Sequence, residues 1–173
     1  REVLAKFTVD RGIPTPAAMS ADGRVVAAVR GGRVVVWDIE SQTVVPSFKD
    51  VSTNAGSIED MKFSPDGKNI LAIGNALWLL DANRGQQLHK WRLSGDTVQY
   101  FGDGRQCIVS GTDGAFRVDL VDGKAERLDV GDYDNRFAST AVFPAADARS
   151  AMLYVANTEE ERRLEFAPID DLS

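Results

Sequence analysis

The sequence predicts an all-β fold, a β-propeller of about four blades with four antiparallel strands in each, on four observations. An acidic-glycine turn, two apolar runs and a closing aspartate occur in that order three times, with turn glycines at Gly23, Gly67 and Gly104. The turn glycines are spaced by about 40 residues, which is the length of one propeller blade. Asp-Gly and Gly-Gly pairs, which favour tight hairpins, separate the apolar runs. The runs are short and nearly continuous, as in strands that are buried on both faces.

The first two blades are predicted over residues 17–49 and 58–94. Turns at Asp22-Gly23 and Gly31-Gly32 divide the first blade, and turns at Pro65-Asp66-Gly67, Gly74-Asn75 and Asn83-Arg84-Gly85 divide the second. The strands expected between these turns are Ala17–Met19, Val25–Val29, Val34–Ile39 and Val44–Phe48 in the first blade, and Ile58–Phe63, Asn69–Ile73, Leu77–Leu80 and Gln87–Leu93 in the second.

The third and fourth blades are predicted over residues 98–130 and 139–170. Three Asp-Gly pairs divide the third blade, whereas the fourth has Asp147-Ala148 where an Asp-Gly pair is expected. The expected strands are Val98–Phe101, Cys107–Ser110, Ala115–Leu120 and Ala125–Val130, then Thr140–Phe143, Ala151–Ala156 and Arg163–Ala167. An extra strand over residues 3–9 would complete the fourth blade and close the ring. The alternative is half of a larger ring, completed by a second copy or by further sequence.

Composition limits the classes of function. The chain has 173 residues, of which 43% are hydrophobic, and its net charge is −6. Since no run of Lys or Arg forms a basic stripe, we expect no nucleic-acid partner. The apolar runs are too short to cross a bilayer, so we expect no membrane insertion by this segment. Cys107 is the only cysteine and favours a reducing compartment such as the cytoplasm, although a periplasmic protein without disulfides would look the same.

Three phrases resemble the WD-repeat family over nearly the whole chain. They are the Trp-Asp ending at Val34–Asp38, the first-strand phrase at Ile58–Lys68 and the middle hairpin at Ser110–Asp119. The family's usual Gly-His pair is missing, because the only histidine, His89, falls in a predicted outer strand. The resemblance implies a degenerate WD-repeat scaffold that presents loops and one ring face to proteins or peptides.

Most of the distinctive residues fit a structural role. Trp37 and Trp78 are interpreted as equivalent positions in the third strands of successive blades, which predicts that both pack in the core between blades. The residues assigned to the structural repeat are Asp22, Gly23, Trp37, Asp38, Asp66, Gly67, Trp78, Asp81, Asp103, Gly104, Asp113, Gly114 and Asp119.

Few residues of this sequence are candidates for catalysis or metal binding. Catalysis would need His89 as the base, and its position in an outer strand fits an exposed edge better. The oxygen ligands of Asp132, Asp134 and Asn135 could hold calcium, although the loop lacks the twelve-residue pattern that ends in glutamate. We therefore expect no catalytic residue and no cofactor.

The candidate contacts for a protein partner are few. Trp91 and Arg92 lie in the outer strand of the second blade, where Trp91 is expected to be partly exposed. Tyr133 and Arg136 lie in the polar loop 131–139, which we expect on the same face as the loop 51–57. The resulting hypothesis is a non-catalytic scaffold that binds proteins or peptides and that could form a homodimer. The alternative is a ligand- or metal-binding propeller domain accessory to an enzyme located elsewhere in a longer protein.

Overall fold

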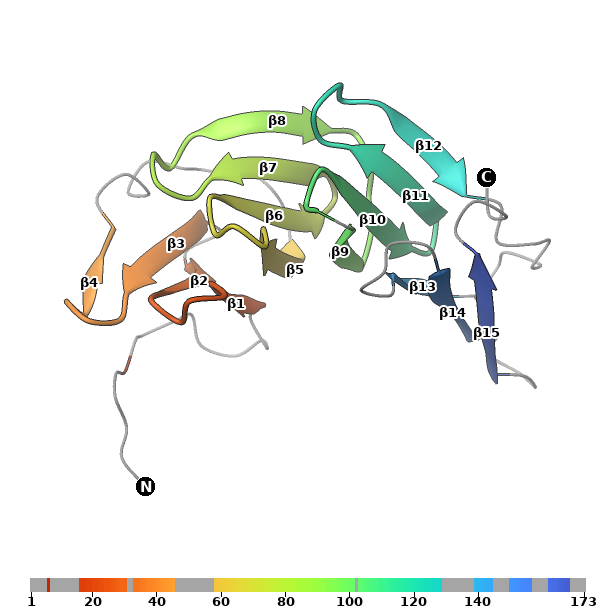
Figure 1. Cartoon of the computed structure of the whole chain (residues 1–173), viewed down its shortest axis with the longest axis horizontal. Helices are drawn as coiled ribbons and strands as arrows, with labels where there is room; N and C mark the ends of the chain where they lie inside the picture. Colours follow the sequence, from red (N-terminus) through yellow and green to blue (C-terminus); the bar gives the residue numbers. More distant parts are fainter. Residues whose placement is uncertain are drawn as a thin grey trace. The chain divides into compact units, whose positions relative to one another are not determined.

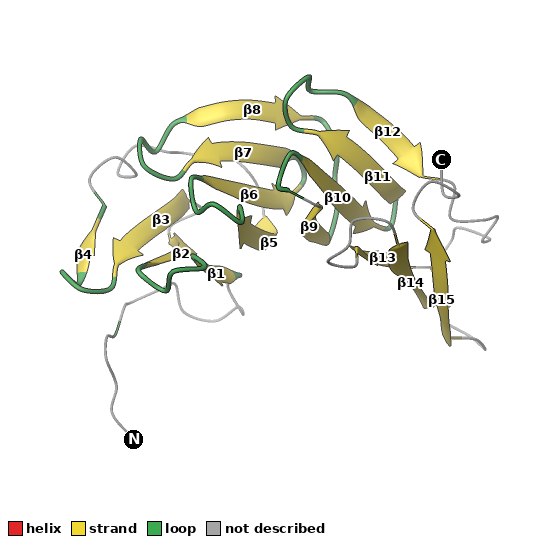
Figure 2. Ribbon diagram, viewed as in Figure 1, coloured by secondary structure: helices red, strands yellow, loops and turns green. Residues whose placement is uncertain are grey.

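A computed structural model describes residue 6 and residues 16–30, 33–45, 58–101, 103–128, 139–144, 150–156 and 162–168. All of the regular secondary structure in these residues is β-strand (Figure 2). None of the described residues forms a helix that could span a membrane. The chain divides into two compact units, Arg1–Leu93 and Ser94–Ser173, which are described separately.

The first unit contains two four-stranded antiparallel sheets, each a meander in which successive strands pair (Figure 1). The strands of the first sheet are β1 (Ala17–Met19), β2 (Val25–Arg30), β3 (Arg33–Asp38) and β4 (Thr43–Val44). The strands of the second sheet are β5 (Ile58–Phe63), β6 (Asn69–Gly74), β7 (Leu77–Asp81) and β8 (Gln87–Trp91).

The second unit contains a four-stranded sheet and a three-stranded sheet with the same meander order. The strands of the third sheet are β9 (Thr97–Phe101), β10 (Gln106–Gly111), β11 (Gly114–Asp119) and β12 (Ala125–Leu128). The strands of the fourth sheet are β13 (Ser139–Pro144), β14 (Ser150–Ala156) and β15 (Arg162–Pro168).

The strand order agrees with the all-β prediction, and most boundaries agree to within one or two residues. The fourth strand of the first sheet is shorter than expected, because β4 ends at Val44 and residues 46–50 lie outside the described residues. The predicted extra strand at residues 3–9 also lies outside them, apart from Lys6. Closure of a ring by this strand, and the number of blades in that ring, stay predictions.

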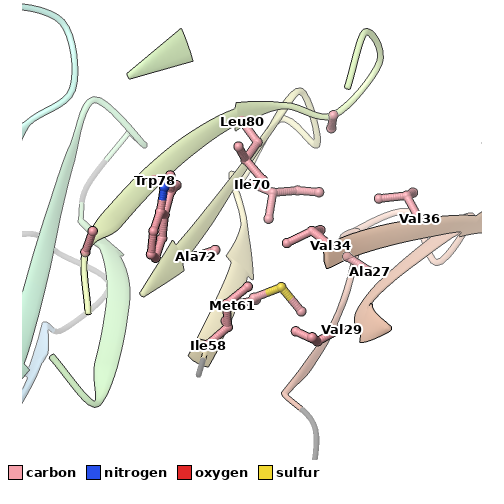
Figure 3. Close-up of a cluster of buried hydrophobic side chains, with 12 residues drawn as sticks. Ala27, Val29, Val34, Val36, Ile58, Met61, Ile70, Ala72, Trp78 and Leu80 are labelled. Atoms are coloured by element: carbon pink, nitrogen blue, oxygen red, sulfur yellow. The ribbon is translucent and has the colours of Figure 1, made fainter. Parts of the chain in front are cut away.

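A buried cluster of apolar side chains joins the first and second sheets (Figure 3). Because paired residues in an antiparallel ladder share a face, the register defines which face each sheet contributes. The first sheet contributes Ala27, Val29, Val34 and Val36, and the second contributes Ile58, Met61, Ile70, Ala72, Trp78 and Leu80. The other face of β6 and β7 is buried as well, as predicted for strands covered on both faces.

The two core tryptophans are both buried, but the prediction that they occupy equivalent positions is wrong. Trp37 pairs with Val26, one residue before the closing Asp38. Trp78 pairs with Ala72, three residues before the closing Asp81. Because side chains alternate between the two faces of a strand, the two-residue offset keeps both rings on the corresponding face of their own sheet. That face of the second sheet, which includes Trp78, contributes to the cluster, whereas the residues that the first sheet contributes come from the face opposite to Trp37. A shared residue type in a repeat therefore does not ensure a shared position.

The outer strand of the second sheet contains a β-bulge. His89 pairs with Leu79 and Gln87 pairs with Leu80, so Leu88 is an extra residue without a counterpart on β7. Leu88 is 50% exposed. A bulge interrupts the regular ladder and increases the local twist of the strand.

Candidate functional site

The turn between β1 and β2 is held by a small network of hydrogen bonds. The Ser20 hydroxyl donates to Asp22 Oδ1 over 2.6 Å and accepts from the Val25 backbone N–H over 3.1 Å. Asp22 Oδ1 also accepts the backbone N–H of Arg24 over 3.0 Å. Gly23 has a φ of 70°, a conformation that glycine adopts without the steric cost of a side chain. One serine and one aspartate thus fix the path of the backbone from β1 to β2.

The turn between β5 and β6 repeats the same network. The Ser64 hydroxyl donates to Asp66 Oδ1 over 2.6 Å and accepts from the Asn69 backbone N–H over 2.9 Å. Asp66 Oδ1 accepts the Lys68 backbone N–H over 3.1 Å. The third sheet has a reduced version, in which Asp103 accepts from the Arg105 N–H and Phe101 stands in place of the serine. The full network is therefore present twice among the described turns.

A second kind of turn repeats between the third and fourth strands. Asp81 Oδ1 accepts the backbone N–H groups of the second and third residues after it, and Asp119 Oδ1 does the same. Each of these turns ends on a glycine with positive φ, Gly85 at 64° and Gly123 at 77°. In the first sheet the equivalent position is Gln42, with a φ of 55°. Asp38 accepts both the backbone N–H and the hydroxyl of Ser41.

A groove of about 380 Å³ lies in the first unit where these turns of the first and second sheets come together. Residues of both serine–aspartate turns line it, together with Asp38 at the end of β3 and Asn83 in the turn that follows β7. The lining residues are Ser20, Ala21, Asp22, Arg24, Val25, Asp38, Pro65, Asp66, Gly67, Lys68 and Asn83.

The three aspartates of the groove are held in the ionised form. The Ser20 hydroxyl lowers the pKa of Asp22, and the Ser64 hydroxyl lowers the pKa of Asp66. The backbone N–H of Ser41, followed by its hydroxyl, lowers the pKa of Asp38. Each effect arises because the donated hydrogen bond favours the charged carboxylate over the neutral acid. The Oδ1 atoms accept hydrogen bonds within the turns, so the Oδ2 atoms of Asp22 and Asp38 are the carboxylate atoms that can accept from a ligand.

Two cations share the groove with these carboxylates. Arg24 lies 3.9 Å from Glu40, and Lys68 lies 3.5 Å from Asp66 Oδ2. All four side chains are largely exposed, and ion pairs of this kind contribute little to stability because water screens them. The two cations can therefore exchange these contacts for those of a ligand at small cost, and the groove offers charges of both signs.

The described residues that line the groove include no serine–histidine pair of the kind used in nucleophilic catalysis. Ser20, the serine in this lining, donates its hydroxyl to the carboxylate of Asp22. Burial raises the pKa of the Cys107 thiol in the third sheet, which disfavours the reactive thiolate. Among the described residues no three His, Cys, Asp or Glu side chains come together as a metal-binding group. The side chains that line the groove can pair with charges and form hydrogen bonds.

The predicted contact residues lie elsewhere. Trp91 is only 7% exposed, so the expectation of a partly exposed ring is wrong; the ring lies against His89, with centroids 4.1 Å apart. Arg92 is exposed just after β8. Tyr133 and Arg136, and the calcium candidates Asp132, Asp134 and Asn135, lie outside the described residues.

The groove lies at the end of the strands where the β1–β2, β3–β4 and β5–β6 turns are found, whereas β5 begins at the opposite end. The loop 51–57 and residues 131–138 of the second predicted binding loop lie outside the described residues. Ser20, Ser64, Arg24 and Lys68 were not among the predicted site residues. The signal that could have identified them is the Ser-x-Asp-Gly-basic phrase, which occurs at both turns.

No protein-family model matches this chain, and no curated protein matches it. Solved structures are similar to this chain. Over 98% of its length the chain is similar to half (50%) of a chain of hydrazine synthase from Kuenenia stuttgartiensis, with a TM-score of 0.75 and 17% identity. It is also similar over 91% of its length to 41% of the chain of TolB from Acinetobacter baumannii, with a TM-score of 0.59 and 22% identity.

The likeness supports a β-propeller-like fold. At these identities it shows the fold alone, because one fold serves many unrelated functions. The chain spans about half the length of the hydrazine synthase chain and about two-fifths of the TolB chain.

Proposed function

We propose that this chain is a non-catalytic scaffold of the WD-repeat type that binds a protein or peptide, and that the turn groove is its contact site. The observation that carries the proposal is the groove itself, which is lined by two copies of one hydrogen-bonded turn. The turns hold the groove walls in a fixed shape, so a partner does not have to order them on binding. Such pre-organisation favours affinity.

The charges of the groove suit an extended peptide with side chains of both signs. Lys68 and Arg24 can pair with acidic side chains of the peptide, and the Oδ2 atoms of Asp22 and Asp38 can accept from basic ones. The WD-repeat assignment is supported by the three sequence phrases, and Pro65, Asp66 and Gly67 of the phrase at Ile58–Lys68 line the groove. Propeller-like neighbours are consistent with a scaffold.

A matched pair of lysines provides the test. Lys68 and Lys124 each follow an Asp-Gly pair, each donates its backbone N–H to that aspartate, and each pairs with it, at 3.5 and 3.3 Å. Lys68 lines the groove, whereas Lys124 lies in a turn of the third sheet. The two alanine variants therefore remove the same charge from the same local structure at two places.

Peptides selected from a random display library on the immobilised chain would be titrated by fluorescence anisotropy. We expect Lys68→Ala to weaken the selected peptides about tenfold, equivalent to about 1.4 kcal/mol, and Lys124→Ala to leave their Kd unchanged. Arg24→Ala should act like Lys68→Ala. An equal response to the two lysine variants, or none, would show that the groove is not the contact site.

The second candidate is a propeller domain accessory to an enzyme in a longer protein. The likeness of this chain to half of a hydrazine synthase chain favours it, since that protein is named for an enzymatic activity. Under this candidate the groove would bind a small polar ligand, and the peptide library would give no groove-dependent binder.

A further inference from the structure

The Asp-Gly pairs of this chain carry a reactivity of their own. The sequence has five such pairs, and three of them form the equivalent first turn of the first, second and third sheets. These are Asp22-Gly23, Asp66-Gly67 and Asp103-Gly104. All three aspartates are exposed, so water reaches each pair. A glycine after an aspartate leaves its backbone nitrogen open to the aspartate side chain, because glycine has no side chain of its own.

An Asp-Gly pair can rearrange with water as the only other reactant. The backbone nitrogen of the glycine attacks Cγ of the neutral aspartic acid, so that a C–N bond forms and the Cγ–OH bond breaks. The hydroxyl leaves as water with the proton of the backbone N–H, which gives a cyclic imide. Water then adds at the backbone carbonyl carbon of the aspartate and breaks the C–N bond there. The product is isoaspartate, in which the main chain runs through Cβ and Cγ and the α-carboxylate is free.

This rearrangement needs a neutral carboxyl that can turn toward the glycine nitrogen, and two of the turns oppose both requirements. Asp22 Oδ1 accepts the Ser20 hydroxyl over 2.6 Å and a backbone N–H over 3.0 Å. Asp66 Oδ1 accepts the Ser64 hydroxyl over 2.6 Å and a backbone N–H over 3.1 Å. Each serine also lowers the pKa of its aspartate, since the donated hydrogen bond favours the carboxylate. Both serines are buried, which holds their hydroxyls in place.

The third turn lacks the serine. Phe101 stands at its position. Among the described residues the Asp103 side chain accepts the backbone N–H of Arg105 over 3.0 Å and no hydroxyl. The attacking nitrogen is also held less closely, because the Gly104 N–H donates to the Phe101 carbonyl over 3.2 Å, whereas the equivalent bonds of the first and second sheets are 2.9 Å long. Asp103 can therefore leave its position at a smaller cost than the other two aspartates.

The remaining two Asp-Gly pairs belong to turns of other kinds. Gly114 is the first residue of β11, and the carboxylate of Asp113 before it accepts the Ser94 hydroxyl. Asp122 accepts the backbone N–H of Lys124 over 2.9 Å and also lies 3.3 Å from the ammonium group of the same residue. The three equivalent turns are thus the matched set in which the presence of the serine can be compared.

We propose that Asp103-Gly104 is the isoaspartate-forming site among the three equivalent turns, and that Ser20 and Ser64 protect the other two. Residues of both protected turns line the turn groove, whereas Asp103 lies in the third sheet. The serine hydroxyls thus preserve the groove walls against a slow change of the backbone. The proposal does not depend on the binding of a peptide in the groove.

Peptide mapping by mass spectrometry tests the proposal, with electron-transfer fragmentation to distinguish isoaspartate from aspartate. The whole chain is incubated at mildly acidic pH, and circular dichroism checks that it stays folded. We expect isoaspartate to accumulate at Asp103 at least about fivefold faster than at Asp22 and Asp66, which is the effect of about 1 kcal/mol on a rate. Equal accumulation at the three positions, or slower accumulation at Asp103, would overturn the proposal.

Ser64→Ala isolates the role of the hydroxyl. It should raise the rate at Asp66 about fivefold and leave Asp22, in the same unit, unchanged. Ser64→Thr keeps a hydroxyl and should keep the protection. Ser41→Ala is the control, since the Ser41 hydroxyl donates to Asp38, which isoleucine rather than glycine follows.

Two results with folded Ser64→Ala would refute protection by the serine. One is an unchanged rate at Asp66, and the other is an equal rise at Asp22 and Asp66, which a general loosening of the unit would produce. If Ser64→Ala does not fold, the comparison of the three turns in the unmodified chain still decides which of them forms isoaspartate.

Discussion

Replacing Trp78 by alanine should destabilise the first unit more than any exposed substitution. Trp78 is 1% exposed and lies in the cluster between the first and second sheets, as Figure 3 shows. Burial of a tryptophan removes about 150–250 Å² from water, which at about 25 cal/mol per Å² corresponds to about 4–6 kcal/mol. Truncations of buried aromatic residues cost about 3–5 kcal/mol, because the cavity relaxes only in part. We expect a loss within that range.

Two contacts of the indole refine this magnitude. The Lys90 Nζ lies 5.3 Å from the ring centroid, a cation–π contact worth about 0.5–1 kcal/mol that alanine also removes. The indole Nε1 is buried and has no hydrogen-bond partner among the described residues, and such an unsatisfied donor costs about 1–3 kcal/mol. Trp78→Phe removes this donor and keeps an aromatic ring, so it should cost about half as much as Trp78→Ala.

Urea unfolding followed by far-UV circular dichroism measures both variants, since it does not depend on the fluorescence of the tryptophan that is removed. Leu88→Ala, at a half-exposed site in the same sheet, is the control and should change the free energy of unfolding by less than about 0.5 kcal/mol. A loss below about 1 kcal/mol for Trp78→Ala would refute the packing of the ring between the two sheets.

Four further predictions concern the turns. Gly111→Ala should cost several kcal/mol, because its Cβ would lie 2.9 Å from the Cα of Gly95. Gly23→Ala has open space around its Cβ, so it should cost only about 1–2 kcal/mol, the penalty for a side chain in the left-handed conformation. Equal losses of stability for the two variants in thermal unfolding would contradict this. Gln42→Gly should stabilise the chain by up to about 1 kcal/mol by relieving a positive φ, and an unchanged or lower Tm would count against it. Ser64→Ala should cost about 1–2 kcal/mol, since it breaks the bond to the turn aspartate and leaves a backbone N–H unpaired, as urea unfolding can check. The pKa of Asp66 is lowered in the folded state from its ordinary value of 3.8. The ionised Asp66 side chain therefore contributes its full stabilisation above about pH 4 to 5, and this stabilisation is lost as the pH falls through the lowered pKa. Asp66→Asn should reduce the loss of stability between about pH 4 and 2.

Much of the fold can be predicted from the sequence, because turn chemistry is local. Gly23, Gly67 and Gly104 adopt positive φ at the predicted turns, and each apolar run between turns forms a strand. The relative position of the two tryptophans could have been counted in the sequence, since Trp37 directly precedes the closing Asp38 whereas two residues separate Trp78 from Asp81. The structure agrees with that count, because the two rings lie two positions apart in the ladder.

The groove was harder to predict, because it depends on two turns from different sheets. Asp22 and Asp66 were recognised as repeat residues, and their bonds to Ser20 and Ser64 explain why the repeat includes a serine. Nothing in a single turn shows that its copy from the next sheet lies close enough to enclose a groove. Trp91 failed as a contact candidate for a related reason, since an outer strand is exposed on average while its last residue is buried.

The bulge at Leu88 limits how larger assemblies of this chain can form. A regular outer strand presents a ladder of free backbone groups to any other extended chain, and this is a route to uncontrolled edge-to-edge association. The extra residue in β8 disrupts that ladder in the middle of the strand, and the exposed side chains beside it include the charged Lys90. Growth by adding strands to the second sheet is therefore discouraged. A further sheet can then be added in an ordered way by packing face to face against an existing sheet. Such packing is limited to faces whose side chains match.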